Sequence, residues 1–219
     1  MAALGLAAAC SSAGSRTKPL VTQPPAATST SLKLDTSAKE LLGLLTKGKQ
    51  VVYHATYTAV VQGTSASLEL WQKPPLVRRD TNFNVGGSSS TKTEEFKLHD
   101  QLVGCLQQSG GPWKCTQEPA SSGDPSDAVL SNVGASLSGR SVTARSDTVS
   151  GRPVRCYSAA AVGSLGAVEI CLTPDTGIPV LVDAGAGRIT LASFELTVPD
   201  NVFSLPATPT PVTTTTITP

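Results

Sequence analysis

Four cysteines fall into two close pairs, and their spacing constrains the fold more than any other feature of the chain. The pairs are Cys105 with Cys115 and Cys156 with Cys171. If the members of each pair face each other across an antiparallel hairpin, the turns fall at residues 109–111 (Ser-Gly-Gly) and 163–164 (Gly-Ser). Both are favoured hairpin loop lengths, with glycine available for the left-handed backbone position. The sequence therefore predicts two hairpins with directly opposed cysteines.

Opposed cysteines in such hairpins can form disulfides. Opposite residues of antiparallel strands lie about 4.5–5.5 Å apart at Cα, which a disulfide bridges without strain. Structural disulfides persist in oxidising compartments outside the cytoplasm. The alternative for the same four residues is a four-thiol metal site, which prefers CxxC spacing that this sequence lacks. The spacing favours two disulfides and an extracytoplasmic protein with no bound metal.

The fifth cysteine, Cys10, closes a small-residue apolar run and is followed by a polar, flexible stretch. This pattern is typical of a bacterial lipoprotein, with residues 1–9 as signal peptide and Cys10 as the lipid attachment site. The leader is short and has no basic residue, which fits a truncated or weak signal. The alternative is an Ala-rich N-terminus with a chance cysteine. We predict a protein anchored by lipid to the outer face of the cell membrane, since no later segment has the roughly 18 apolar residues of a membrane span.

Composition divides the remainder of the chain into three parts. Residues 10–30 carry the lipidated cysteine and a disordered tether rich in Ser, Thr, Ala and Pro. Residues 31–206 form one folded domain, and residues 207–219 form a disordered Thr/Pro tail with nothing to pack against. The 17 basic and 16 acidic residues of the 219-residue chain are nearly balanced and form no basic run. Nucleic-acid binding, which relies on clustered Lys and Arg, is therefore not expected.

Hydrophobic periodicity predicts an α+β domain with a large antiparallel sheet. A first helix is expected from Ser37 to about Lys47, started by a capping box of Ser37 with Glu40 and stopped near Gly48. A second is expected from Asp124 to Gly139. Strands of alternating apolar residues are expected at 51–61, 66–70, 77–83, 93–98, 102–107, 113–117, 141–148, 154–161, 167–172, 178–184 and 189–196.

Residues for catalysis are sparse, and we predict that the chain is not an enzyme. His54 and His99 are the only histidines, and His54 lies on the polar face of its strand. Glu94 and Glu95 alternate across one strand and therefore cannot act together as an acid/base pair. No serine elbow, metal triad, phosphate loop or dinucleotide fingerprint is present. The sequence predicts no catalytic residue, no metal and no cofactor.

Two segments resemble the LolA-like lipoprotein carrier superfamily. Residues 67–79, SLELWQKPPLVRR, resemble its early strand pair, in which an apolar or aromatic residue, a basic residue and Pro lead into a strand bearing Arg. Residues 151–157 (GRPVRCY) followed by 171–179 (CLTPDTGIP) look like the disulfide hairpin of LolA-like lipoproteins of the LprG and LppX type. The ending at residues 198–206, VPDNVFSLP, is similar to the way such domains finish. Neither Arg78 nor Arg79 can be matched to the arginine that holds the Gram-negative carriers closed.

This resemblance implies a curved sheet, a half-open β-barrel, enclosing or capped by two or more helices around an apolar cavity. It also implies a lipid or acyl-chain ligand, carried or presented near the membrane. The candidate ligand-lining residues are Tyr53, Tyr57, Leu68, Leu70, Trp71 and Trp113. The alternative is a lipid-anchored sensor or protein-interaction module with a filled core, no ligand and an unidentified protein partner. Cavity walls and solid cores use the same residues, so the sequence does not separate the two.

Overall fold

The computed structural model describes residues 33–61, 63–85, 89–99, 101–118, 133–162, 166–184 and 187–211. The predicted signal peptide, Cys10 and the tether lie outside these residues, as do the start of the second predicted helix and the turn at 163–164. The lipid-attachment hypothesis therefore stays a prediction. Among the described residues, no helix has the length and apolar character needed to cross a membrane.

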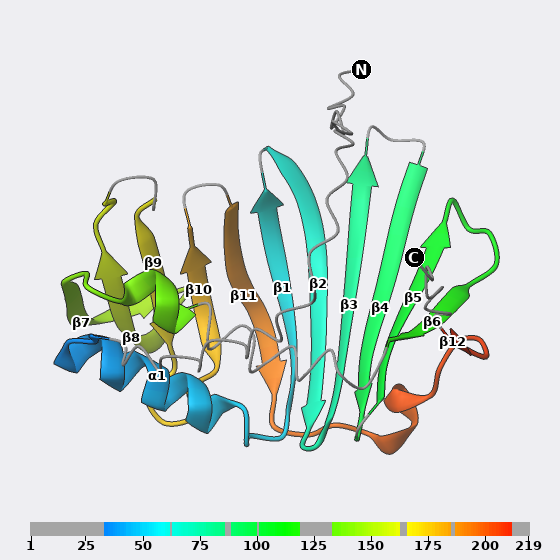
Figure 1. Ribbon diagram of the computed structural model, residues 1–219, viewed down its shortest axis with the longest axis horizontal. Helices are drawn as coiled ribbons and strands as arrows, with labels where there is room; N and C mark the ends of the chain where they lie inside the picture. The colour runs from blue at the N-terminus through cyan, green and yellow to red at the C-terminus, as the bar shows by residue number, and fades with distance from the viewer. Residues whose placement is uncertain are drawn as a thin grey trace, which may run out of the picture. The chain divides into compact units, whose positions relative to one another are not determined.

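Twelve strands form one sheet in the described part of the chain. Figure 1 shows the sheet curving from β7 at one end to β12 at the other without closing. The spatial order is β12-β6-β5-β4-β3-β2-β1-β11-β10-β9-β8-β7, and all neighbours are antiparallel except β12 and β6. The strands are β1 Tyr53–Val61, β2 Thr64–Lys73, β3 Leu76–Val85, β4 Ser89–Leu98, β5 Gln101–Gln108, β6 Lys114–Glu118, β7 Val142–Val149, β8 Arg152–Ala159, β9 Val168–Leu172, β10 Pro179–Asp183, β11 Gly187–Glu195 and β12 Thr210–Pro211. The predicted antiparallel α+β fold is confirmed at this level.

Helix α1, Thr36–Gly48, defines one face of the sheet, which we call the helix face. The buried Leu41 of α1 belongs to the same apolar cluster as Tyr157 and Ile170 of β8 and β9. Side chains of directly paired residues point to the same side of a sheet. Pairing runs from Ile170 to Val182, Ile189 and Ala59, so the face continues across β10 and β11 to β1. The opposite side is called the outer face.

The start of α1 differs from the predicted capping box. Asp35, not Ser37, is the N-cap: its carboxylate accepts a hydrogen bond from the backbone N–H of Ala38 at 2.7 Å. The same carboxylate accepts a second hydrogen bond from the N–H of Val142 at 2.7 Å, so it also ties α1 to β7. These two donors lower the pKa of Asp35. Both residues are good N-caps, and the contact with β7 explains why the earlier one is used.

In the described part of the chain, helical cover lies at one end of the helix face. Residues 133–137 are helical, and Gly139 follows with φ of +74°, in agreement with the predicted stop of the second helix. This segment and α1 pack over β7, β8 and β9. The cluster contains Ala38, Leu41, Leu137, Val142, Tyr157, Ala159, Ile170 and Leu172. The predicted capping of the sheet by helices is thus present in part.

Both predicted disulfides are present. Cys105 is paired directly with Cys115 across β5 and β6, and Cys156 with Cys171 across β8 and β9. Each pair is bonded, with its Cα atoms 4.0 Å apart. Around the first hairpin, Ser109 and Gly110 have positive φ, as the predicted turn requires. All four sulfurs are in disulfides in this structure, whereas the alternative metal site needs free thiolates.

The C-terminal segment covers the outer face of β4, β5 and β6, which the sequence analysis did not anticipate. Leu205 and Ala207 pack against a buried cluster of Phe96, Val103 and the Cys105–Cys115 disulfide. Beyond them Thr210 pairs with Thr116, and its hydroxyl donates to the carbonyl of Cys115 at 3.2 Å. The start of the predicted tail is therefore ordered, because it covers apolar side chains on strands that are distant in sequence. Residues 212–219 lie outside the described part of the chain.

Candidate ligand site

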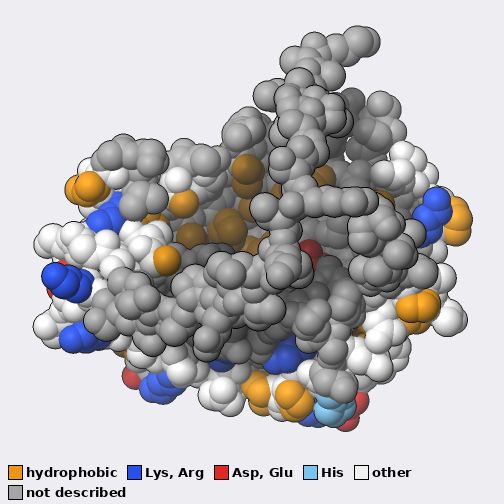
Figure 2. Space-filling model, viewed as in Figure 1, with side chains coloured by type: hydrophobic (Ala, Val, Ile, Leu, Met, Phe, Trp, Pro, Cys, Tyr) orange, Lys and Arg blue, Asp and Glu red, His pale blue; other side chains and the backbone are white. Residues whose placement is uncertain are grey.

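The structure separates the six candidate lining residues between the two faces of the sheet. Tyr53 and Tyr57 of β1 lie on the helix face, as do Leu68 and Leu70 of β2, which are only partly buried. In the view of Figure 2, hydrophobic side chains are visible over the middle of the sheet. These four residues share one surface, and their contact with a ligand stays a prediction.

The two tryptophans lie on the outer face. Trp71 alternates with Leu70 and Gln72 along β2, so its ring points the opposite way. Trp113 packs against the cluster that contains Phe96 and the Cys105–Cys115 disulfide. The six residues therefore lie on two faces, and a ligand contact of either tryptophan stays a prediction.

The tyrosines of β1 belong to the buried core. Tyr53 is 4% exposed and Tyr57 is 5% exposed. Burial raises the pKa of Tyr53 to about 12 and raises the pKa of Tyr57 further. Both rings are thus neutral at physiological pH, which suits a contact with apolar groups.

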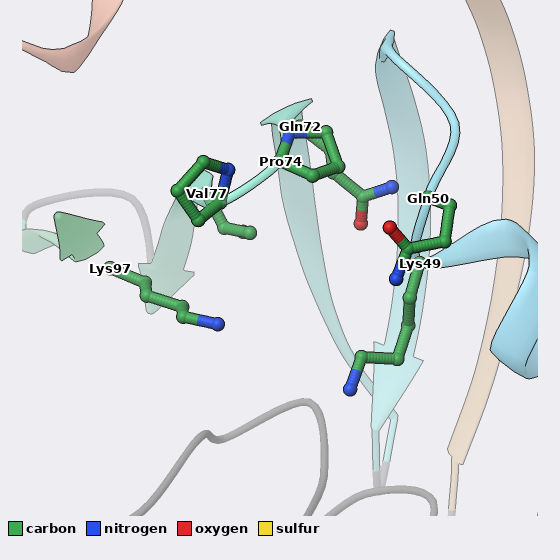
Figure 3. Close-up of a pocket in the computed structure, with 7 residues that line it drawn as sticks. Lys49, Gln50, Gln72, Pro74, Val77 and Lys97 are labelled. Carbon is green, nitrogen blue, oxygen red and sulfur yellow. The ribbon is translucent and has the colours of Figure 1, made fainter. Parts of the chain in front are cut away.

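A pocket opens at the end of the helix face, beside the C-terminus of α1. Its volume is about 380 Å³, and its lining comes from the loop after α1, from β2, β3 and β4, and from the turn between β2 and β3. Figure 3 shows Lys49 and Lys97 entering from opposite sides, with their ammonium groups extending toward the same space. The lining residues are Lys49, Gln50, Gln72, Pro74, Pro75, Val77 and Lys97.

Gln72 organises one wall of this pocket. Its side chain is 7% exposed, and its amide nitrogen donates to the carbonyls of Gly48 and Val51, each at 2.7 Å. The carbonyl of Gly48, at the end of α1, also accepts a hydrogen bond from the backbone N–H of Val51 at 3.2 Å. The two bonds fix this polar wall in place.

The sequence analysis did not identify Lys49, Gln72 or Lys97. A signal for Gln72 existed, because it falls in the apolar alternation of Leu68 and Leu70 on β2. A polar residue at such a position is buried only with hydrogen-bond partners. The two lysines carried no local signal, since only the pairing of β2 with β3 and of β3 with β4 brings Lys97 to the row of Gln72.

The outer face carries an ionic cluster centred on Arg78. Its guanidinium donates twice to Asp80 at 2.7 Å and lies 2.9 Å from Glu94. It also donates to the carbonyl of Val202 at 2.7 Å and lies over the rings of Trp71 and Phe96. Burial raises the pKa of Asp80 and of Glu94, against the opposing effect of Arg78. The cluster therefore holds the C-terminal segment against the sheet.

Replacing the central cation should destabilise the fold in a pH-dependent way. Arg78→Met leaves two mostly buried carboxylates facing each other, and we expect a loss of about 2 kcal/mol at pH 7. A carboxyl whose pKa is raised on folding stabilises the fold fully below its unfolded pKa, and this contribution is lost as pH rises through the folded value. The deficit of the variant should therefore be smaller at pH 5 than at pH 7, as measured by urea unfolding.

The neighbouring arginine supplies the control. Arg79 pairs with Glu95 across the exposed part of the helix face, where the two side chains are 44% and 51% exposed. Exposed pairs contribute little, so Arg79→Met should change the free energy of unfolding by less than about 0.5 kcal/mol. Equal losses in the two variants, or a loss that does not vary with pH, would contradict the role given to Arg78.

The structure describes the surroundings of both histidines. His54 hydrogen-bonds Glu69 at 2.7 Å through Nε2 and stacks on Trp71, with ring centroids 5.0 Å apart. This agrees with the expected satisfied side chain on the polar face of β1. His99 has φ of +60° at the exposed turn between β4 and β5. Glu169 lies close to the sulfurs of Cys156 and Cys171, but those two atoms are bonded to each other.

Known structures share this fold at low sequence identity. A chain of the Pseudomonas aeruginosa MucA/MucB complex matches with a TM-score of 0.51 and 15% identity, over 78% of this chain and 61% of that chain. A crystal structure of MucB matches with a TM-score of 0.49 and 14% identity, over 78% and 63%. This chain thus spans about three fifths of the length of those chains. An uncharacterized conserved protein from Thermus thermophilus matches with a TM-score of 0.42 and 13% identity, over 74% and 88%.

No protein-family model and no curated protein matches the sequence. The likeness to the MucA/MucB complex concerns the fold alone. The curved open sheet agrees with the fold that the LolA-like resemblance implies, and membership in that superfamily stays a prediction.

Proposed function

We propose that this chain is a lipid-anchored extracytoplasmic protein that binds an acyl chain or another apolar ligand on the helix face, for carriage or presentation near the membrane. The observation that supports this most is a group of partly buried apolar side chains on the helix face beyond α1. There Leu68, Leu70, Val77 and Phe83 share one face across β2 and β3, with Arg79 and Thr81 between the last two. Each methylene buried against such a surface contributes about 0.8 kcal/mol, so a long chain binds without any catalytic group.

The compartment and the anchor rest on separate arguments. Two disulfides indicate an oxidising environment outside the cytoplasm. Lipid attachment rests on the sequence around Cys10. The function proposed is non-enzymatic and needs no cofactor.

Protein binding is the second candidate. It is favoured by the matching chain from the MucA/MucB complex, which was solved as an assembly of two proteins. Under this alternative the sheet is a filled scaffold and a partner protein binds its surface. The two functions differ in whether an apolar small molecule binds at all.

A ligand-binding experiment separates the two. We expect the full chain, isolated from cells, to release acyl lipids in native mass spectrometry, and to bind a fluorescent fatty acid after they are extracted. Leu68→Asp should weaken binding of the fluorescent fatty acid by at least about tenfold, because it places a charge among apolar side chains of the helix face, opposite Thr81. Val60→Asp is the control, since Val60 is already 48% exposed. A protein that is repeatedly empty and does not bind the probe would contradict the proposal and favour protein binding.

A further inference from the structure

The two ends of the sheet differ in how the described part of the chain covers them. At one end the C-terminal segment pairs with β6 through the short strand β12, Thr210–Pro211. At the other end β7, Val142–Val149, is the last strand, and Figure 1 shows it at the rim of the sheet. An edge strand presents a row of backbone N–H and C=O groups with which another strand can pair. The edge of β7 is therefore a candidate interaction surface.

The turn between β7 and β8 determines which backbone groups point to the open side. Ser150 and Gly151 have φ of +51° and +75°, and the pair Val149 and Arg152 closes this two-residue turn. Such a closing pair exchanges both of its N–H···O bonds, and the direction then alternates along the strand. The odd-numbered residues of β7 thus bond to β8, and the even-numbered residues direct their backbone groups outward.

Three residues provide the accessible part of this edge. The N–H of Val142 already donates to the carboxylate of Asp35 at 2.7 Å, which leaves Ala144, Ser146 and Thr148. The side chains of Ser146 and Thr148 are exposed. The N–H of Thr148 donates to the carboxylate of its neighbour Asp147 at 2.7 Å, and strand pairing would replace that exposed bond with one to a carbonyl.

The charges of β7 select one register for pairing with a second copy of the same strand. Arg145 and Asp147 point to one face of the sheet, with side chains 50% and 43% exposed. An antiparallel pair centred on Ser146 places Arg145 of each copy directly opposite Asp147 of the other. Centring the pair on Arg145 or on Asp147 would instead oppose like charges, which is destabilising. Centres between two residues would pair outward groups with inward ones.

The ion pairs within one chain are compatible with this arrangement. Arg145 lies 3.2 Å from Asp147 and 2.5 Å from Glu169. Neither contact has to break, because a guanidinium has five N–H donors and a carboxylate accepts at about four positions. Pairing therefore extends an existing ionic network across the symmetry axis, and the choice of register does not depend on an unpaired charge.

We propose that two copies of this chain form a symmetric dimer through β7, with one continuous sheet running through both. The backbone groups of Ala144, Ser146 and Thr148 supply the hydrogen bonds, and Arg145 with Asp147 fixes the register. An interface of this kind uses the same patch on both copies. It is independent of any ligand on the helix face.

Disulfide cross-linking tests the contact and its register. In the full chain carrying Cys10→Ser, the substitution Ser146→Cys places one thiol opposite its own copy, with Cα atoms about 5.5 Å apart. That separation suits a disulfide, and mild oxidation should give a linked dimer. Thr148→Cys is the control, because it is equally accessible but lies opposite Ala144 of the second copy. It should cross-link at least about tenfold more slowly. Equal rates, or no dimer with Ser146→Cys, would overturn the proposal.

Charge reversal supplies a second test in the Ser146→Cys chain. Arg145→Asp and Asp147→Arg each oppose like charges in the dimer, so each should slow cross-linking by at least about tenfold. An equimolar mixture of the two variants should restore it, because two aspartates of one chain then lie opposite two arginines of the other. A variant that failed to fold would not be restored by mixing. Unchanged cross-linking in the separate variants, or no restoration in the mixture, would overturn the register.

Discussion

Gly177→Ala is expected to lower the free energy of unfolding by about 3–5 kcal/mol, the largest loss we predict for a single substitution. Gly177 lies in the turn between β9 and β10 with φ of +70°, a conformation that alanine adopts poorly. A Cβ atom at this position would lie 2.0 Å from the carbonyl oxygen of Leu44 in α1. The turn cannot yield easily, because Thr173 makes backbone hydrogen bonds of 2.9 Å with both Gly177 and Ile178. Urea unfolding of the variant measures the loss.

Two other glycines distinguish the part of this loss that comes from the steric contact from the part that comes from the positive φ. Gly151 has φ of +75°, but no described atom lies within 4 Å of the position that a Cβ would take, so Gly151→Ala should cost only about 1 kcal/mol. Gly48 meets the same turn from α1, and its Cβ would lie 2.6 Å from the carbonyl oxygen of Gly177.

Alanine normally stabilises a helix by about 1 kcal/mol relative to glycine. Gly43→Ala, at an open position of α1, should do so, whereas Gly48→Ala should destabilise. Stabilisation by Gly48→Ala would show that α1 does not pack closely on the turn.

Local patterns were sufficient to predict most of the sheet. Alternation located eleven of the twelve strands in the described part of the chain within a few residues, because a sheet with one apolar face has period two along each strand. The register of both cysteine hairpins also followed from sequence, since the spacing of each pair and the glycine-containing turn between them had to agree. These features depend only on residues that are close together in the chain.

Contacts between distant segments could not be predicted in this way. Asp35 caps α1 because Val142, more than a hundred residues later, supplies a second donor to the same carboxylate. The segment at residues 205–211 is ordered because the apolar outer face of β4, β5 and β6 lies beside it, although its own composition is that of a tail.

Part of the candidate site could be predicted from the sequence, and part could not. Alternation places Tyr53, Tyr57, Leu68 and Leu70 on one face and was sufficient to exclude Trp71 from it. The pocket required more, because Lys49 and Lys97 meet only when β4 is paired to β3 and α1 ends beside β2. Residues that come together from separate elements of the fold have no signature within any short window of sequence.

Loss of the disulfides is the second large effect that we expect. The Cys156–Cys171 bond closes a 15-residue separation, for which loop-closure entropy alone gives about 3 kcal/mol. Both cysteines are fully buried, and their neighbours Tyr157 and Leu172 contact the cluster beneath α1. Cys156→Ala with Cys171→Ala should therefore lower the free energy of unfolding by about 3 kcal/mol, as measured by the urea midpoint at constant slope.

Chemical reduction of the disulfides provides the control for this prediction. It also relates the stability of the chain to the compartment in which it folds. Dithiothreitol should destabilise the unmodified chain by more than it destabilises the Cys156→Ala, Cys171→Ala variant, in which only Cys105–Cys115 remains to be reduced. A variant that also lacks Cys105 and Cys115 should not respond.

Two bonds of about 3 kcal/mol each are a large share of the roughly 5–15 kcal/mol that stabilises an ordinary domain. The chain should thus fold stably only where its thiols oxidise, and a reduced protein with an unchanged urea midpoint would contradict the extracytoplasmic location.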